Sequence, residues 1–367
     1  MKLLIAGGGT GGHLFPGISV AEEFMARSAE NRVLFVGTER GIEARVLPRL
    51  GMPLECIAAS GVRGKQGLAQ AKGLALFLYG YAQSRRILKE FTPDLVLGVG
   101  GYASAPLCLA ARGMQIGYFV HEQNAIPGLT NRLLARFAHE IFISLEESRK
   151  FFPNGKIILT GNPVRKEISE GNLEPQPTAM NQGDRVSLLV FGGSQGAHSI
   201  NQGFLAALPH LASVRDRLAI THQTGEKDWT EVAEGYRQHG FEATVLPFID
   251  DMAEAYRKAD LVVCRAGATT IAEVTTSGKA CLFIPFPHAV DDHQRKNAEA
   301  LLKEDACFML LERELSGERL AATLQELLAD PERLRSVGSN ARQLARLDAA
   351  KIIVDQMLAL RQAAKGT

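Results

Sequence analysis

The feature that most constrains the fold of this chain is the order of its apolar segments. Short stretches without a polar residue, such as 3–6 and 33–36, alternate with longer stretches of helical periodicity, such as 18–26. Strands that are apolar throughout and are joined by helical crossovers are typical of a parallel sheet covered on both faces. The sequence therefore predicts an α/β fold.

The same order begins again after a segment that interrupts it. Residues 172–184 are rich in proline and polar side chains and lack apolar periodicity, which is typical of a linker or long loop. A second series of apolar strands starts at 186–191. Because 367 residues exceed what one hydrophobic core usually serves, we expect two domains.

Both domains are predicted to be doubly wound, Rossmann-like parallel sheets that face each other across a cleft. We place the N-terminal domain at 1–163 and the C-terminal domain at 164–340. The last segment, 341–367, is expected to pack back on the first domain through one long helix at roughly 340–364.

The composition argues against several kinds of partner and site. The net charge of +1 gives no general reason to expect nucleic acid, although residues 1–170 carry 20 Lys and Arg against 14 Asp and Glu, which favours an anionic partner for the first half. The five cysteines form no CxxC pair, so we expect free thiols in a reducing cytoplasm. The longest run without charge or histidine, 95–111, is broken by glycines and Pro106, so no membrane-spanning helix is expected.

A glycine-rich loop, GGGTGGH, follows the first strand at residues 7–13 and leads into a helix. Glycines let backbone N–H groups approach a ligand, and a helix N-terminus favours an anion. Gly7, Gly9 and Gly12 also satisfy the pattern of a dinucleotide site. A tight strand-to-helix turn is the structural alternative.

The second domain opens with a similar loop, FGGSQGA, at residues 191–197. Each domain therefore begins with such a loop. This arrangement favours a substrate held between two glycine loops over a cofactor that lies along one sheet. A plain turn is again the alternative.

Three further polar segments stand at strand ends. Residues 121–124 (HEQN) follow a buried strand, where four adjacent polar side chains are costly unless they are paired. Residues 265–273 carry small side chains at a helix start, and residues 288–297 form a polar helix start. The alternatives are a hydrogen-bonded turn, a carboxylate favoured by the helix dipole and a helix cap, respectively.

Seven motifs together resemble the MurG family of glycosyltransferases, which converts lipid I to lipid II in peptidoglycan synthesis. They are GGGTGGH (7–13), VGGYAS (99–104), HEQNAIPG (121–128), GNPVR (161–165), FGGSQGA (191–197), FIDDM (248–252) and CRAGATTIAE (264–273). The resemblance runs through both domains in the family's order. It implies a GT-B fold and an inverting transfer of N-acetylglucosamine from UDP-GlcNAc to the 4-hydroxyl of the muramyl residue of lipid I.

The resemblance also implies which residues surround the UDP-sugar. They are Thr10, Gly11, Gly12, Asn124, Arg165, Ser194, Ile249, Ala268, Thr269, Thr270, Ile271, Ala272, Glu273 and Gln294. Ser194 and Arg165 suit the diphosphate, whose charge grows as UDP departs. Glu273 suits the two ribose hydroxyls, and the backbone around Ile249 suits the uracil edge. Asn124 and Gln294 offer amides to the sugar.

An inverting transfer needs a base for the proton of the acceptor. His13 is our first candidate, because imidazole is a base at neutral pH. Glu122 is the second candidate, with His121 helping to orient it. The Gly100, Gly101 and Tyr102 loop is expected to bind the diphosphate of lipid I.

No cofactor is expected. A metal at the diphosphate is not expected either, because no Asp-x-Asp motif is present. One position departs from the family pattern: His293 precedes Gln294 where two glutamines are usual.

The expected partners, besides UDP-GlcNAc and lipid I, are an anionic membrane surface and other proteins of cell-wall synthesis. Residues 73–84 carry no charge and are flanked by Arg63, Lys65 and Lys72 on one side and by Arg85, Arg86 and Lys89 on the other. Such a segment can lie in a lipid interface, although an ordinary core helix has the same pattern. We expect peripheral attachment at the cytoplasmic face of the bacterial inner membrane.

The sequence leaves three other functions open. A UDP-N-acetylglucosamine epimerase would share the fold and the donor but would need no acceptor. A nicotinamide-dependent dehydrogenase would account only for the first glycine loop. A non-catalytic sugar-nucleotide sensor would not need polar loops in both domains.

Overall fold

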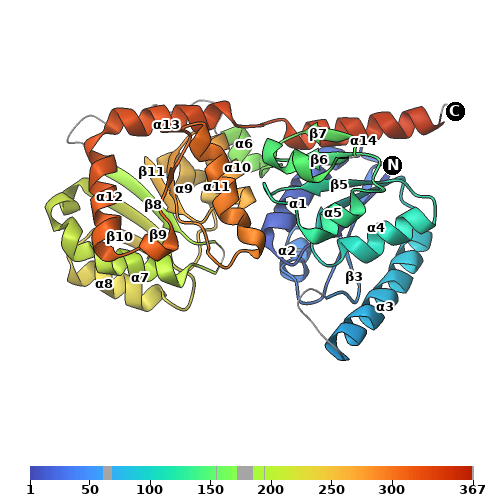
Figure 1. Ribbon diagram of the computed structural model, residues 1–367, viewed down its shortest axis with the longest axis horizontal. Coiled ribbons are helices and arrows are strands. Elements are labelled where there is room, and N and C mark those ends of the chain that lie inside the picture. The colour runs from blue at the N-terminus through green and yellow to red at the C-terminus, as the bar shows by residue number, and fades with distance from the viewer. Residues whose placement is uncertain (61–67, 154, 172–184, 194, 366–367) are drawn as a thin grey trace. The chain divides into compact units, whose positions relative to one another are not determined.

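The computed structural model describes residues 1–60, 68–153, 155–171, 185–193 and 195–365. The chain forms two compact units. The N-terminal unit comprises Met1–Arg165 and Arg346–Thr367, and the C-terminal unit comprises Lys166–Ala345. Both contain a sheet whose paired strands are all parallel, so the predicted pair of Rossmann-like α/β domains is confirmed (Figure 1).

The N-terminal unit is built on seven strands in the order β3-β2-β1-β4-β5-β6-β7. The strands are β1 (Lys2–Gly7), β2 (Arg32–Gly37), β3 (Leu54–Cys56), β4 (Leu95–Gly100), β5 (Tyr118–Glu122), β6 (Ile141–Ile143) and β7 (Ile157–Leu159). The helices are α1 (Gly11–Ala26), α2 (Glu43–Arg49), α3 (Leu68–Phe91), α4 (Ser104–Gly113), α5 (Leu129–Leu134), the short η1 (Glu146–Phe151) and, from the end of the chain, α14 (Ala349–Lys365).

The interior strand β1 shows why residues 3–6 are apolar throughout. Leu3 and Ile5 enter one hydrophobic cluster with residues of α1 and α14, whereas Leu4 and Ala6 enter another with residues of α3 and α4. Successive side chains of a strand point to opposite faces, so a strand covered on both sides must be apolar at every position.

The C-terminal unit is built on six strands in the order β10-β9-β8-β11-β12-β13. The strands are β8 (Val186–Phe191), β9 (Leu218–Gln223), β10 (Ala243–Leu246), β11 (Leu261–Cys264), β12 (Ala280–Phe283) and β13 (Phe308–Met309). The helices are α6 (Lys166–Gly171), α7 (His198–Ala207), α8 (Trp229–Gln238), α9 (Met252–Lys258), α10 (Ala268–Ser277), α11 (His293–Lys303), α12 (Gly317–Ala329) and α13 (Pro331–Gln343), with short turns η2 (Leu208–Arg217), η3 (Val290–Asp292) and η4 (Glu312–Glu314).

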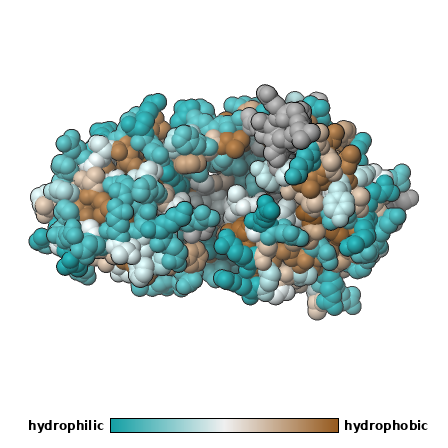
Figure 2. All heavy atoms as spheres, turned by 90° about the horizontal axis from the view of Figure 1, so that it is seen from below, coloured by the Kyte–Doolittle hydropathy of each residue, from teal (hydrophilic) through white to brown (hydrophobic). Residues whose placement is uncertain are grey.

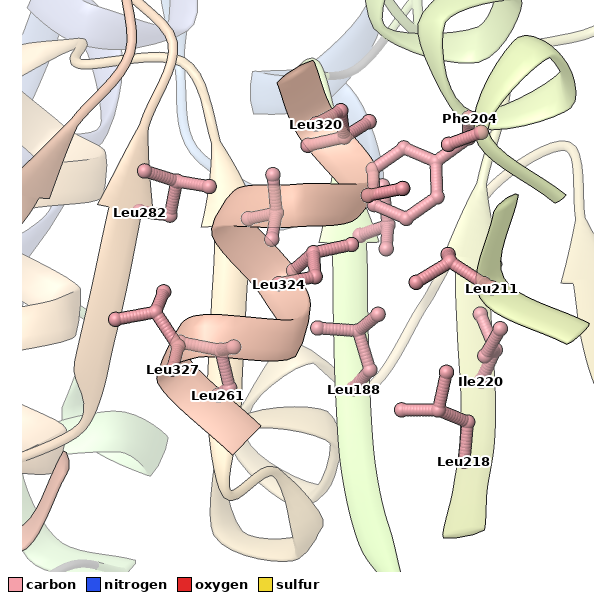
Figure 3. Close-up of a cluster of buried hydrophobic side chains, with 14 of the residues drawn as sticks. Leu188, Phe204, Leu211, Leu218, Ile220, Leu261, Leu282, Leu320, Leu324 and Leu327 are labelled. Carbon is pink, nitrogen blue, oxygen red and sulfur yellow. The ribbon is translucent and has the colours of Figure 1, made fainter. Parts of the chain in front are cut away.

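The core of this unit lies between its sheet and the helices around α12. Leu320 and Leu324 of α12 belong to the same hydrophobic cluster as Leu188 of β8, and Leu324 lies beside Leu188 (Figure 3). All three side chains are at most 2% exposed, so this face of the sheet is closed to solvent.

The end of the chain differs from our prediction. The single helix expected at 340–364 is wrong, because α13 ends at Gln343 and α14 begins at Ala349. Between them Arg346 passes so close to Gly161 that a side chain there would collide with it, and the chain enters the N-terminal unit at this point. α14 then buries Ile353 and Met357 beside α1.

Candidate functional site

Each sheet has one place where neighbouring strands send their connections in opposite directions. In the N-terminal unit it lies between β1 and β4, and in the C-terminal unit between β8 and β11. Ligands of doubly wound sheets bind at the carboxyl ends of the strands at such a point. The glycine loops and the polar segments singled out in the sequence follow these strands or their neighbours, so each unit has its own candidate site.

The two loops that follow β1 and β4 pack backbone against backbone. A side chain on Gly101 would collide with the carbonyl of Gly8. Both residues have a positive φ that favours glycine, +82° at Gly101 and +145° at Gly8. Ser104 secures the second loop, because its Oγ accepts from the Gly100 N–H at 3.1 Å. Tyr102, at the tip of the loop, is exposed.

A carboxylate that the sequence analysis did not single out supports the first glycine loop. Glu43 is 1% exposed and accepts hydrogen bonds from the Gly9 N–H at 2.7 Å and the Thr38 N–H at 2.8 Å. A side chain on Gly8 or Gly41 would occupy the space of this carboxylate. Gly8 of this loop, together with Gly41, therefore leaves room for a carboxylate of the protein itself.

His13 lies in the first turn of α1, with its ring against the second loop. A Cβ on Gly100 would lie 2.9 Å from both Cε1 and Nδ1 of the imidazole, so only glycine allows this approach. The Nδ1 atom is 3.0 Å from Oε1 of Gln123. His13 is thus held between Gly100 at the end of β4 and Gln123 after β5, and it is half-buried.

Gln123, the first residue after β5, also contacts His121 near the end of that strand. The Gln123 Nε2 atom is 3.0 Å from His121 Nδ1, and His121 Nε2 is 3.3 Å from the Gly161 carbonyl. His121 is 1% exposed, and this burial lowers its pKa to about 4.

Glu122 points to the opposite face of β5 and is fully engaged in shaping the next loop. Its Oε1 accepts from the Asn124 N–H at 2.9 Å, and its Oε2 accepts from Asn131 Nδ2 at 2.9 Å and from the Gly128 N–H at 3.2 Å. Burial raises its pKa, and these hydrogen bonds act in the other direction. Its bonds are those of a residue that fixes the loop carrying Asn124, and His121 contacts Gln123 in place of the Glu122 that we expected it to orient.

Arg165 and Phe15 lie together near the start of α1. The guanidinium carbon is 5.2 Å from the centroid of the Phe15 ring, a cation–π distance. This contact gives the cation a defined position beside Gly11, which itself lies against the same ring.

The glycine loop of the C-terminal unit packs against the loop after β9. A side chain on Gly196 would collide with the Thr224 carbonyl, and one on Gly225 would collide with the Gln195 carbonyl. Ser194, expected at the diphosphate, lies outside the described residues.

Gln223 joins this loop to the segment that carries Ile249. Its Nε2 donates to the Gly193 carbonyl at 2.7 Å, and its Oε1 accepts from the Ile249 N–H at 2.8 Å. Gln223 is 3% exposed. Gln223 was not predicted from the sequence, because nothing local marks a glutamine at a strand end as a bridge.

The segment from Ala268 to Glu273 forms the first turns of α10. The Ile271 N–H donates to the Gly267 carbonyl at 2.9 Å, which makes it the first amide bonded in the helical manner. The amides that precede it point out of the helix start, where they favour an anion. Glu273 is 4% exposed and accepts from the Tyr256 hydroxyl at 3.2 Å.

Gln294 and His293 start α11. The Gln294 Oε1 accepts from the Phe286 N–H at 3.0 Å, which fixes the orientation of its amide. The His293 Nδ1 is 2.7 Å from the Val290 carbonyl, to which it donates. The histidine that departs from the family pattern thus serves the local turn. In the described part of the chain, no group of three or more His, Cys, Asp or Glu side chains is placed to hold a metal ion.

Comparisons with known proteins show the family to which the chain belongs. The model of the glycosyltransferase family 28 N-terminal domain matches residues 3–143, and that of the C-terminal domain of the same family matches 187–355. A UDP-N-acetylglucosamine–N-acetylmuramyl-(pentapeptide) pyrophosphoryl-undecaprenol N-acetylglucosamine transferase from Geotalea uraniireducens is 68% identical over 97% of this chain and 98% of its own length. The enzyme of the same name from Geobacter sulfurreducens is 65% identical, with 98% of each chain covered.

Among solved structures, MurG of Acinetobacter baumannii matches with a TM-score of 0.79 and 31% identity, over 98% of this chain and 99% of its own. A UDP-GlcNAc 2-epimerase from Neisseria meningitidis matches with a TM-score of 0.69 at 16% identity, over 98% and 100% of the two chains, which shows a shared fold alone. The chain belongs to glycosyltransferase family 28 and, within it, to the MurG family.

Proposed function

We propose that this protein transfers N-acetylglucosamine from UDP-GlcNAc to the lipid-linked N-acetylmuramyl-pentapeptide, lipid I, and so makes lipid II for peptidoglycan synthesis. The observation that carries the proposal is the 68% identity with a transferase of that name along nearly the whole chain. The polar loops at the strand ends of both units supply the groups that the reaction needs.

The donor is bound by the C-terminal unit. The start of α10 and the glycine loop after β8 present backbone amides, which stabilise the charge that grows on the diphosphate as UDP departs. Glu273 binds the ribose, the backbone near Ile249 reads the uracil, and Gln294 binds the sugar. The other expected donor contacts are Thr10, Gly11, Gly12, Asn124, Arg165, Ser194, Ala268, Thr269, Thr270, Ile271 and Ala272.

The acceptor is activated by the N-terminal unit. His13 Nε2 removes the proton of the muramyl 4-hydroxyl while its oxygen attacks the anomeric carbon. The attack comes from the side opposite the UDP oxygen, whose bond to that carbon breaks with its electron pair leaving on UDP, so the configuration at the carbon inverts. The loop of Gly100, Gly101 and Tyr102 binds the acceptor diphosphate. We favour His13 over Glu122 as the base, because the Glu122 carboxylate is occupied by Asn131 and by the loop amides.

Transfer of labelled N-acetylglucosamine to a lipid I analogue, with UDP release measured in parallel, tests the activity. Equal amounts of labelled lipid product and UDP are expected. Incubation with UDP-GlcNAc alone is the control for the epimerase alternative. Formation of the manno isomer without an acceptor would overturn the proposal.

Attachment to an anionic membrane surface at the cytoplasmic face is a separate part of the proposal, and α3 supports it. None of the helices in the described ranges combines the length and the apolar character needed to cross a membrane. The solvent face of α3 carries Leu74, Leu78 and Tyr79, each 58–60% exposed, and further along Arg85 and Arg86, also exposed. The flanking Arg63 and Lys65 lie outside the described residues.

Figure 2 faces the side of the molecule along which α3 lies in Figure 1, and it shows hydrophobic surface among hydrophilic surface on the N-terminal unit. An apolar helix face followed by cations fits an interface of lipid tails and anionic headgroups.

Leu78→Glu is expected to weaken binding to anionic vesicles about tenfold. It removes an apolar side chain that would be buried in lipid on binding, and it adds a negative charge that anionic headgroups repel. The neighbouring Phe77 is half-buried, so changing it would also disturb the packing of α3. Co-sedimentation measures binding, with Leu302→Glu on α11, an exposed leucine of the other unit, as the matched control. If neither Leu78→Glu nor the anionic lipid content changed the binding, the proposed attachment through α3 would be contradicted.

A further inference from the structure

The orientation of the Gln123 amide follows from what it faces. Its nitrogen lies 2.9 Å from the Val99 carbonyl oxygen, which can only accept a hydrogen bond. An oxygen in the place of that nitrogen would meet another oxygen without a proton between them. The amide nitrogen therefore faces Val99, and Oε1 must face the other way.

This orientation determines where the proton of His13 lies. Gln123 Oε1 is 3.0 Å from His13 Nδ1, and an amide oxygen only accepts. Nδ1 must therefore carry the hydrogen. In a neutral imidazole, the lone pair is then on Nε2.

His121 completes the same arrangement from the far side of the amide. The second N–H of Gln123 donates to His121 Nδ1 at 3.0 Å, so that Nδ1 must be unprotonated. His121 Nε2 then carries the hydrogen and donates to the Gly161 carbonyl at 3.3 Å. Its pKa of about 4, lowered by burial, keeps the ring neutral at physiological pH, as this pattern requires. The hydrogen bonds from His13 to Gly161 can thus be satisfied by one arrangement of protons, with the Ser144 hydroxyl, 3.3 Å from His121 Nε2, as a second acceptor for that N–H.

We propose that Gln123 is a positioning residue that holds His13 in the tautomer with the proton on Nδ1 and the lone pair on Nε2. The inference rests on the proposed function, in which Nε2 takes the proton of the acceptor hydroxyl. Gly100 supports the same orientation, because its lack of a side chain lets the Nδ1 edge of the ring lie inward. After proton transfer, the Gln123 oxygen keeps accepting from Nδ1–H of the imidazolium. A histidine in the other tautomer would present an N–H to the acceptor and could not act as a base.

Nitrogen NMR of the imidazole ring tests the tautomer directly, because a protonated and an unprotonated ring nitrogen have well separated chemical shifts. In the full-length protein labelled with ¹⁵N-histidine, the signals of His13 are assigned by their loss in His13→Gln. We expect the unprotonated nitrogen of His13 to be Nε2. An unprotonated Nδ1 would overturn the inference, whatever the activity of the enzyme.

Two variants separate positioning from a merely structural role. Gln123→Met keeps the length of the side chain but removes the acceptor, and we expect the Nδ1–H preference to be lost and kcat to fall roughly tenfold, with the donor KM within about twofold. Gln123→Glu keeps an acceptor for His13 but places an oxygen toward Val99, so it should be less stable yet retain the Nδ1–H tautomer. Loss of the tautomer in both variants, or in neither, would contradict the inference.

The failure of the inference is distinguishable from the failure of the proposed function. If His13 shows the expected tautomer while His13→Gln retains full turnover, the base is another residue and Gln123 only orders the loop. If His13→Gln abolishes turnover but the ring has its proton on Nε2, His13 is essential to the reaction without the tautomer that we infer, and the role of Gln123 falls.

Discussion

Substituting alanine for His13 is expected to lower kcat about 10²–10⁴-fold, the usual contribution of a general base, while UDP affinity stays within about twofold of the wild type. His13 belongs to the N-terminal unit, whereas the amides of α10 and the Gln223-linked loops belong to the C-terminal unit. The loss should therefore fall on the chemical step. Turnover is measured with a lipid I analogue, and UDP binding by calorimetry.

The matched control is His210→Ala, which removes an exposed histidine of the C-terminal unit. It should leave both quantities unchanged. Glu122→Gln offers a second comparison, since its carboxylate accepts from Asn131 and from two loop amides. We expect this change to affect the folding of the loop more than the proton transfer. If His13→Ala turned over like the wild type while Glu122→Gln lost activity without losing stability, the base would have to be reassigned.

The fold was predictable where burial leaves the sequence no choice. β1 and β4 lie in the middle of the sheet and are buried along nearly their whole length, so an apolar run marks them. The edge strands give no such signal. β3 has three residues, including the exposed Glu55, and β13 has two. Segments this short cannot show a periodicity.

The break between α13 and α14 was not predictable for a different reason. Residues 344–348 contain neither glycine nor proline, so local propensity permits one helix through them. The helix ends because the chain passes from one unit to the other there, against Gly161. Tertiary structure overrides propensity at this point.

The loops of the candidate site were predictable from glycine, but the residues that hold them were not. The glycines at 7–12 and 192–196 indicate that the backbone closely approaches a neighbouring group. Glu43, Gln123 and Gln223 bridge segments that are 34, 110 and 30 residues apart in sequence, respectively. The cost of burying HEQN signalled that partners must exist, without saying which.

Glu43→Ala is expected to be the most destabilising of the changes considered, by about 2–5 kcal/mol in the free energy of unfolding. The wild-type carboxylate accepts from the Gly9 N–H, the Thr38 N–H and the Thr38 hydroxyl at 2.7–3.0 Å. Alanine leaves two backbone amides without their acceptor, at about 1–3 kcal/mol each, and a cavity beside them. Urea denaturation followed by circular dichroism measures the loss.

Glu43→Gln provides the graded comparison. An amide can keep its oxygen toward both groups of Thr38, but its NH₂ then faces the Gly9 N–H, so one bond of three is lost, at about 1–3 kcal/mol. The exposed neighbour Glu39, changed to alanine, should cost less than about 0.5 kcal/mol. The loss of stability should decrease in the order Glu43→Ala, Glu43→Gln, Glu39→Ala. This order is expected only if the Glu43 carboxylate acts as the loop's internal anion. Equal stability of Glu43→Ala and Glu39→Ala would mean that the glycine loop holds its shape without that anion, and that its amides have another acceptor.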